Sequence, residues 1–224
     1  MARTVLMSTR PYLDPRDNMN KNFLAAAALV ACAAAQATPI TGTSGLGAPI
    51  VTGATGVVTF ETDAIGSYAS LTDGTLTVSG IGGNIRVAND YAGEYNGRDT
   101  RYLDNSAGGT NGFRFDFSTT VSGFAFNWGA SDVAWTLSAY DALGTLIETA
   151  VAPITGGSNA GDYFGLSAAG IKYATLTASS DGDWVFIDNI AYAAQASNDL
   201  PEPGSIALIG LALLGAGVAR RRSR

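Results

Sequence analysis

The sequence predicts an all-β domain over residues 38–192, an antiparallel two-sheet sandwich of the jelly-roll type. Three observations support this class. Apolar residues alternate with polar ones at a period of two, and β-branched and aromatic residues are concentrated in short runs. Turn-forming pairs such as Asp73-Gly74, Gly82-Gly83 and Asp181-Gly182 separate these runs. No amphipathic helix is evident between them.

Each short apolar run is expected to form one strand. In residues 112–117 the three phenylalanines point to one face, while the arginine and the aspartate point to the other. The tryptophans at 128, 135 and 184 each lie in an apolar run, so we expect them in or near the core. The expected strands, in chain order, are residues 57–60, 75–78, 84–87, 112–117, 121–128, 133–140, 145–151, 163–166, 171–177 and 183–192.

Residues 1–37 are interpreted as an N-terminal extension followed by a secretory signal peptide. From Met19 the chain has a short basic start, an apolar stretch and a small-residue site, Ala35-Gln36-Ala37. We therefore expect translation to begin at Met19 and cleavage to follow Ala37. Leu29-Val30-Ala31-Cys32 also fits a lipobox, and in that alternative Cys32 would be lipidated.

A small, polar linker over residues 193–200 leads to a three-part segment at 201–224. Two prolines flank a glutamate at its start, and a proline cannot continue a helix upstream. The uncharged residues 204–219 would span roughly 24 Å as a helix, short of the ~30 Å hydrocarbon core. This predicts one short transmembrane helix with cytoplasmic arginines. The marked residues are Pro201, Glu202, Pro203, Arg220, Arg221 and Arg222.

This order of parts resembles the PEP-CTERM sorting signal of Gram-negative bacteria. The resemblance implies export, a transient stay in the inner membrane, and processing by an exosortase-type membrane protease. It also implies a final place at the cell surface or outside the cell. An ordinary C-terminal tail anchor is the alternative, but it does not explain the Pro-Glu-Pro triplet.

Charge and composition exclude several functions for the exported part. Residues 38–199 contain five Lys and Arg side chains and sixteen Asp and Glu side chains, a balance of −11. Nucleic acid is therefore not expected as a partner, because its binding requires a basic surface. The chain has no histidine, which excludes a Ser-His-Asp triad, a Cys-His dyad and a His-ligated zinc site.

Two segments near the ends of the domain resemble jelly-roll carbohydrate-binding modules. Residues 57–61 read Val-Val-Thr-Phe-Glu, and residues 186–192 read Phe-Ile-Asp-Asn-Ile-Ala-Tyr. The resemblance implies a structural Ca²⁺ held by Glu61 and Asp188, with Asp63 as a further ligand.

Asp188 is also unusual in its own right. It interrupts an apolar run that begins at Trp184, where an unpaired charge would be costly to bury. As the alternative to a metal ligand, Asp188 caps an edge turn or pairs with Arg86 or Lys172.

The loop at residues 91–102 is the candidate ligand-binding segment. It combines tyrosines with charged and amide side chains, and ring faces can cover the C–H surface of a sugar while planar polar groups bind its hydroxyls. The alternative is that Tyr91 and Tyr102 only cover the end of the sandwich. The candidate ligand-binding residues are Tyr91, Tyr95, Asn96, Arg98 and Tyr102.

These features indicate an exported, non-catalytic surface protein that binds glycans or has a structural role. Its expected partner is extracellular polysaccharide, as in a biofilm matrix. A carboxylate-dependent enzyme acting on glycans is the first alternative, since two Asp or Glu residues suffice for that chemistry. An adhesive ice- or surface-binding protein is the second, although the sequence lacks a clear Thr-x-Thr repeat.

Overall fold

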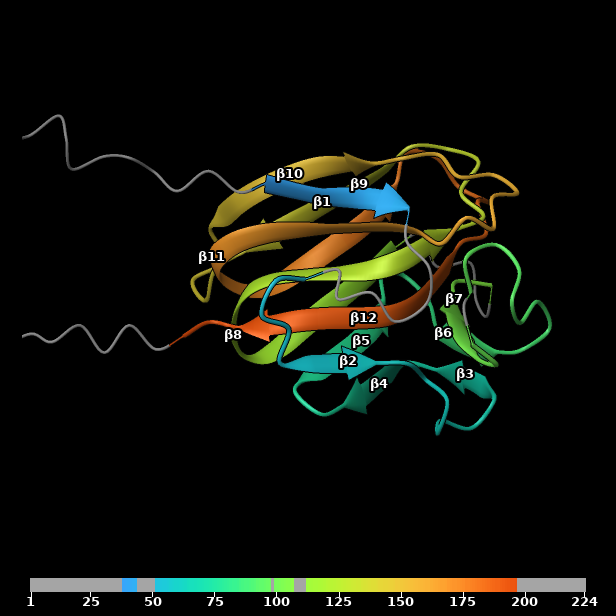
Figure 1. Ribbon diagram of the computed structural model, residues 1–224, viewed down its shortest axis with the longest axis horizontal. Helices are drawn as coiled ribbons and strands as arrows, with labels where there is room; N and C mark the ends of the chain where they lie inside the picture. The colour runs from blue at the N-terminus through green and yellow to red at the C-terminus, as the bar shows by residue number, and fades with distance from the viewer. Residues whose placement is uncertain (1–37, 44–50, 98, 107–111, 197–224) are drawn as a thin grey trace, which may run out of the picture. The chain divides into compact units, whose positions relative to one another are not determined.

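Alternating apolar residues form the strands that dominate the exported part of the chain. The computed structural model describes residues 38–43, 51–97, 99–106 and 112–196 (Figure 1). Within these ranges the chain forms strands only, and it contains no helix that could cross a membrane. The expected signal peptide, the expected transmembrane helix and the sorting motif lie outside the described residues.

The described strands pair antiparallel throughout, which confirms the all-β antiparallel class. They are β1 (Thr38–Thr43), β2 (Gly56–Val58), β3 (Gly66–Tyr68), β4 (Ser70–Asp73), β5 (Leu76–Gly80), β6 (Ile85–Ala88), β7 (Tyr102–Asp104), β8 (Gly112–Gly129), β9 (Trp135–Tyr140), β10 (Leu146–Ala152), β11 (Asp162–Ala178) and β12 (Phe186–Ala194).

The two longest strands, β8 and β11, each join a pair of runs that the sequence predicts as separate strands. The first half of β8 pairs with β5, and its second half pairs with β12. The strand β11 pairs with β8 along both halves, and the register shifts between Ser167 and Tyr173. The second half of β11 also pairs with β9, while its first half pairs with β1.

These pairings place the strands in two layers that share one hydrogen-bonded set of twelve strands (Figure 1). One layer has the order β10-β9-β11-β8-β5-β4. The other layer begins with β1 and continues through the first half of β11 and the second half of β8 to β12. There β12 pairs with β2 and with β7, and β7 is followed by β6 and β3. The sequence predicted two separate sheets. The hydrogen bonds instead join all twelve described strands, because β8 and β11 continue from one layer into the other. The jelly-roll connectivity stays a prediction.

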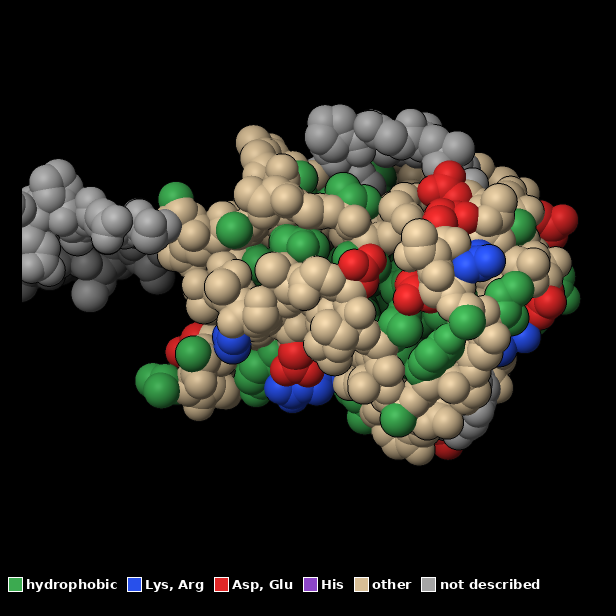
Figure 2. Space-filling model, turned by 90° about the horizontal axis from the view of Figure 1, so that it is seen from below, with side chains coloured by type: hydrophobic (Ala, Val, Ile, Leu, Met, Phe, Trp, Pro, Cys, Tyr) green, Lys and Arg blue, Asp and Glu red, His purple; other side chains and the backbone are tan. Residues whose placement is uncertain are grey.

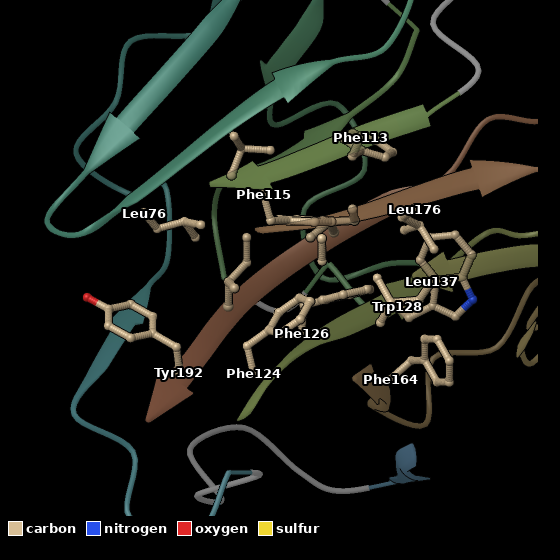
Figure 3. Packing of buried hydrophobic residues seen from close by; sticks show 14 of the residues in the cluster. Leu76, Phe113, Phe115, Phe124, Phe126, Trp128, Leu137, Phe164, Leu176 and Tyr192 are labelled. Carbon is tan, nitrogen blue, oxygen red and sulfur yellow. The ribbon is translucent and has the colours of Figure 1, made fainter. Parts of the chain in front are cut away.

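The aromatic core lies between the two halves of β8. Phe115, on the first half, lies 5.5 Å from Phe126 and 5.6 Å from Phe124, both on the second half. Figure 3 shows these rings facing one another with Leu137 and Leu176 beside them. All five side chains are fully buried, and burial of each stabilises the fold by about 1.5–3 kcal/mol relative to exposure. Hydrophobic packing between the layers therefore holds the domain together.

Trp128 and Trp135 are fully buried in this core, as expected. Their rings meet edge to face at 5.5 Å. The indole N–H of Trp128 donates to the carbonyl of Pro153 at 2.9 Å, so its polar end is satisfied. Trp184 differs, because it lies just before β12 and is only partly buried.

Candidate functional site

The two candidate clusters of the sequence meet at one end of the described domain. Asp188 lies in β12, and its Oδ2 accepts a hydrogen bond from the backbone N–H of Asp99 at 3.3 Å. Glu61 follows β2, and its Oε1 accepts from the backbone N–H groups of Thr100 and Arg101, each at 2.8 Å. Two carboxylates thus hold three consecutive backbone N–H groups of the 91–102 loop.

The hydrogen bonds explain how Asp188 and Glu61 are accommodated. Asp188 is fully buried, and its Oδ1 also accepts from the backbone N–H of Asn189 at 2.7 Å. Burial alone raises the pKa of Glu61, but hydrogen bonds from Thr100 and Arg101 outweigh it and leave that pKa below its usual value. In the described structure, the expected alternative partners of Asp188 bind other groups: Arg86 binds Asp104 and Asp90, and Lys172 donates to the carbonyl of Ser118.

The third expected metal ligand, Asp63, has a different environment. Its Oδ2 is buried without a hydrogen-bond partner in the described structure. Burial raises its pKa, and the charge of Asp73 raises it further, while Arg101 opposes both. Among the described residues, no three Asp, Glu, His or Cys side chains lie close enough together to hold a metal ion. The Ca²⁺ site implied by the resemblance stays a prediction.

A cleft of about 440 Å³ opens beside the 91–102 loop. The loop, the turn after β8, the turn after β10 and the segment before β12 form its walls. We call it the aromatic cleft. Its walls also include Ala130 and three glycines, which leave space for a ligand, and its larger side chains are Tyr91, Tyr95, Asp132, Asp183, Trp184 and Phe186.

The rings of the aromatic cleft pack against one another at steep angles. Tyr91 lies 5.3 Å from Trp184 and 5.7 Å from Tyr95, with interplanar angles of 77° and 71°. Phe186 is buried beneath them and contacts all three rings. Tyr91, Tyr95 and Trp184 remain partly exposed, so their outer surfaces are available to a ligand.

Tyr102 and Asn96 support the loop from the inside. Tyr102 is fully buried, lies 4.4 Å from Phe186, and its hydroxyl accepts from the backbone N–H of Tyr91 at 3.3 Å. Burial raises the pKa of Tyr102 to about 12. The side-chain amide of Asn96 donates to Trp128 O and Asp162 Oδ2, both at 2.9 Å, and accepts from the backbone N–H of Gly161 at 2.8 Å.

The loop also approaches the end of β8 very closely. A Cβ built on Gly129, the last residue of that strand, would overlap the carbonyl oxygen of Tyr95. Tyr95 and Asn96 both have positive φ angles, 50° and 63°, a conformation that costs free energy for residues with side chains. The contacts of Asn96 with β8 and β11 therefore hold the loop in a tight turn against the sheet.

The two carboxylates of the aromatic cleft have different roles. The Oδ2 of Asp183 accepts from the indole N–H of Trp135 at 2.7 Å, and Asp183 also accepts from the backbone N–H of Asp132 at 3.1 Å. The side chain of Asp132 is exposed and has no hydrogen bond or ion pair with other described residues. Asp183 thus fixes the wall, and Asp132 presents a carboxylate to solvent at its edge.

The structure brings two of the five candidate ligand-binding residues into the lining of the aromatic cleft. Tyr91 and Tyr95 line the aromatic cleft, Asn96 and Tyr102 hold the loop in place, and Arg98 lies outside the described residues. Four lining side chains were not among the candidates from the sequence: Asp132, Asp183, Trp184 and Phe186. For Trp184 a signal existed, because it follows the Asp181-Gly182 turn and so stands at the loop end of its strand.

Surface chemistry around the described domain is mixed. Figure 2 shows one face, on which hydrophobic side chains lie close to Asp and Glu side chains and to a few Lys and Arg side chains. Histidine is absent from the whole chain. A ligand at this face therefore meets hydrophobic and acidic side chains and a few basic ones.

Residues 199–223 match the family model described as the PEP-CTERM protein-sorting motif. This confirms the sorting signal predicted from the sequence. The motif implies processing by exosortase and belongs to proteins that are exported and sorted to the cell surface.

A search of curated proteins finds no match. Among solved structures, the chain is similar to the enzymatically active domain of tailspike protein 4 of bacteriophage CBA120, with 14% sequence identity and a TM-score of 0.32. The match covers 54% of this chain and 19% of the tailspike chain.

Proposed function

We propose that the exported β domain binds an extracellular glycan in the aromatic cleft and does not cleave it. The observation that supports this proposal is the grouping of three partly exposed rings, Tyr91, Tyr95 and Trp184, in one cleft of about 440 Å³. That volume lies within the usual range of ~300–1,000 Å³ for small-ligand sites. Aromatic faces cover the C–H surfaces of sugar rings, while hydroxyl and carboxylate groups bind their hydroxyls.

The position of the cleft favours the same function. The cleft is lined by loops next to two strands: β8 ends beside it, and β12 begins beside it. Functional side chains are often found on loops held by a rigid scaffold. The carboxylates Glu61 and Asp188 order the 91–102 loop before any ligand binds, which reduces the entropic cost of binding.

The hydrogen bonds of Asp183 favour binding over hydrolysis. Glycoside hydrolysis uses a pair of carboxyl groups on either side of the scissile bond. In the aromatic cleft, Asp183 is engaged by Trp135 and by backbone N–H groups, which leaves Asp132 as the lining carboxylate without a protein partner in the described structure.

Two assays on the processed protein test this proposal. A glycan array should identify at least one bound glycan, and a reducing-end assay with that glycan should detect no release. Tyr91→Ala should weaken binding by about fivefold or more, because each stacked ring contributes about 1 kcal/mol or more.

Tyr140→Ala is the matched control. The ring of Tyr140 stacks on that of Tyr173, with 4.7 Å between the ring centres. Tyr140 does not line the aromatic cleft, so its substitution should leave glycan affinity unchanged. The non-catalytic proposal would be overturned if the wild-type protein released reducing ends and substitution of a single carboxylate abolished that release. Absence of any bound glycan would favour a structural role in the matrix instead.

A further inference from the structure

The charged groups at the aromatic cleft are unequally distributed. Its lining side chains include Asp132 and Asp183 and, among the described residues, no Lys or Arg. The guanidinium of Arg86 lies 5.9 Å from the centre of the Trp184 ring. Two carboxylates, Asp90 and Asp104, bind this guanidinium at 2.9 Å each. Among the described residues, negative charge therefore exceeds positive charge around the cleft.

Asp132 is held in a defined position at the edge of the aromatic cleft. Its backbone N–H donates to both oxygens of Asp183, at 3.1 and 3.2 Å. The preceding residue, Ser131, is fully buried and exchanges hydrogen bonds with Thr155 across the turn after β10. Hydrogen bonds to Asp183 and to Thr155 thus hold the backbone at residues 131 and 132 in place, while the Asp132 carboxylate is free to bind a ligand.

Resting on the glycan-binding function proposed above, we infer that the ligand carries a protonated amine: a glycan with hexosamine units that lack their N-acetyl groups. The Asp132 carboxylate would accept a charge-assisted hydrogen bond from the ammonium group, which is stronger than a bond between neutral partners. The rings of Tyr91 and Trp184, which line the same cleft, are electron-rich and attract a cation.

The same charges act against other glycans. A uronic-acid polymer would bring its carboxylates close to Asp132 and Asp183 without a cation in the lining to neutralise them, and like charges in an interface are repulsive. A neutral N-acetylated glycan can still stack on the rings, but it leaves Asp132 without an ionic partner. The cleft thus selects amine-bearing over neutral glycans, and neutral over acidic ones.

Calorimetric titration of the processed protein with defined oligosaccharides tests this selectivity. The probes are tetramers of glucosamine and of galactosamine, their fully N-acetylated counterparts, and a galacturonic acid tetramer, at an ionic strength of ~0.15 M where long-range attraction is largely screened. One of the amine tetramers should bind about tenfold more tightly than its N-acetylated counterpart, as one charge-assisted bond predicts. The acidic tetramer should bind most weakly.

Asp132→Asn should remove most of this preference and leave the affinity for the N-acetylated tetramer unchanged. Glu94→Gln is the control with the same change of charge, because Glu94 is exposed on the 91–102 loop beside the cleft and does not line the cleft. It should leave all affinities unchanged. An equal loss of preference in both variants would show unspecific attraction to an acidic domain and would overturn the inference.

The outcomes separate this inference from the proposed function. Equal or tighter binding of the N-acetylated tetramer, with loss of that binding in Trp184→Ala, would overturn the amine inference and leave glycan binding intact. If no tetramer binds and no glycan on the array binds, the proposed function itself is wrong and the inference falls with it.

Discussion

At the scale of single residues, Asp188 illustrates how a buried charge can determine the conformation of a loop. It is fully buried in β12 and accepts backbone N–H groups from Asp99 and Asn189. A buried carboxylate is tolerated when such donors surround it. The sequence showed that Asp188 interrupts an apolar run, but it could not show which donors would meet it, because Asp99 is distant in the chain.

Asp188→Ala should lower the free energy of unfolding by about 2 kcal/mol, since the N–H groups that it binds would lose their acceptor in the protein interior. Urea denaturation measures this change. Asp132→Ala is the control: its exposed carboxylate has no partner among the described residues, so the change should stay within about 0.5 kcal/mol. Equal effects of the two substitutions would contradict the anchoring role.

The same preparations test the predicted Ca²⁺. A ligand that binds only the folded state raises the melting temperature. If Ca²⁺ binds at Glu61 and Asp188, a chelator will lower the melting temperature of the wild-type protein and leave that of Asp188→Asn unchanged. Equal wild-type curves with Ca²⁺ and with chelator would leave loop anchoring as the role of both carboxylates.

Asp63 gives a prediction with a pH dependence. Burial and the charge of Asp73 raise its pKa on folding, so the folded state binds more protons than the unfolded state between the two pKa values. Stability then falls as pH rises through this window, and the cost is fully present above the raised pKa. Asp63→Asn should therefore raise the melting temperature at pH ~7 and lose this advantage below pH ~3.9, the ordinary pKa of Asp.

Melting curves from acidic to neutral pH measure this difference. Asp116→Asn is the comparison, because Asp116 is already paired with Arg114 at 2.7 Å and its substitution removes a partner. A stabilising effect of Asp63→Asn that does not depend on pH would contradict an electrostatic origin.

At the scale of elements, the alternation of residues predicted eight of the described strands in whole or in part. Residues 112–117 and 121–128 were expected as two strands, yet they form the single strand β8. The polar residues between them resemble a turn in the sequence. A strand that bends from one layer into the next has the same local pattern, so only its pairing with β5, β11 and β12 distinguishes the two.

Four described strands were not predicted: β1, β3, β4 and β7. The strands β3, β4 and β7 have three or four residues and lack the valine and isoleucine residues that mark the equally short β2 and β6. The side chains of β1 are mostly exposed, and it is held by its pairing with β11. Distant partners determine these strands, which a local pattern cannot reveal. Trp184 was expected in or near the core, and its partial exposure depends on loops far away in the sequence.

The close approach of the 91–102 loop to β8 gives a prediction at this scale. Gly129→Ala would place a methyl group where the carbonyl oxygen of Tyr95 lies, so the loop must move and Tyr95 with it. We expect a loss of stability of about 1–3 kcal/mol, typical of overpacking, and a loss of glycan binding with the sheet intact. Circular dichroism, melting and calorimetric titration measure the three effects.

Gly66→Ala is the control for this substitution. A Cβ at Gly66, in β3, would have its nearest neighbour at 3.9 Å, which is an ordinary contact. Normal glycan affinity in Gly129→Ala would show that the position of the 91–102 loop does not govern binding.

At the scale of the whole molecule, export and composition agree. The sorting motif at residues 199–223 belongs to an exported protein, and the described domain holds its layers together with aromatic packing. The expected cleavage after Ala37 would place the new N-terminus at Thr38, the first residue of β1, which pairs with Ser167. Cleavage there would leave every described strand whole.

Mass spectrometry of the surface form tests this processing. In a host with the matching exosortase, the protein should begin at Thr38 and lack residues 205–224. Glu202→Ala should remain in the inner membrane. Recovery of Arg224 at the cell surface would contradict exosortase processing, and a lipidated Cys32 at the N-terminus would replace the expected cleavage with the lipoprotein alternative.

The most direct test of glycan binding in the aromatic cleft is tryptophan fluorescence during titration with a glycan that the array identifies. Trp184 lines the cleft, whereas Trp128 and Trp135 are fully buried in the core. We predict a saturable change in emission for the wild-type protein and no change for Trp184→Phe, which keeps an aromatic ring in place. Binding without any change in emission, or an equal change in Trp184→Phe, would contradict the assignment of the glycan to this cleft.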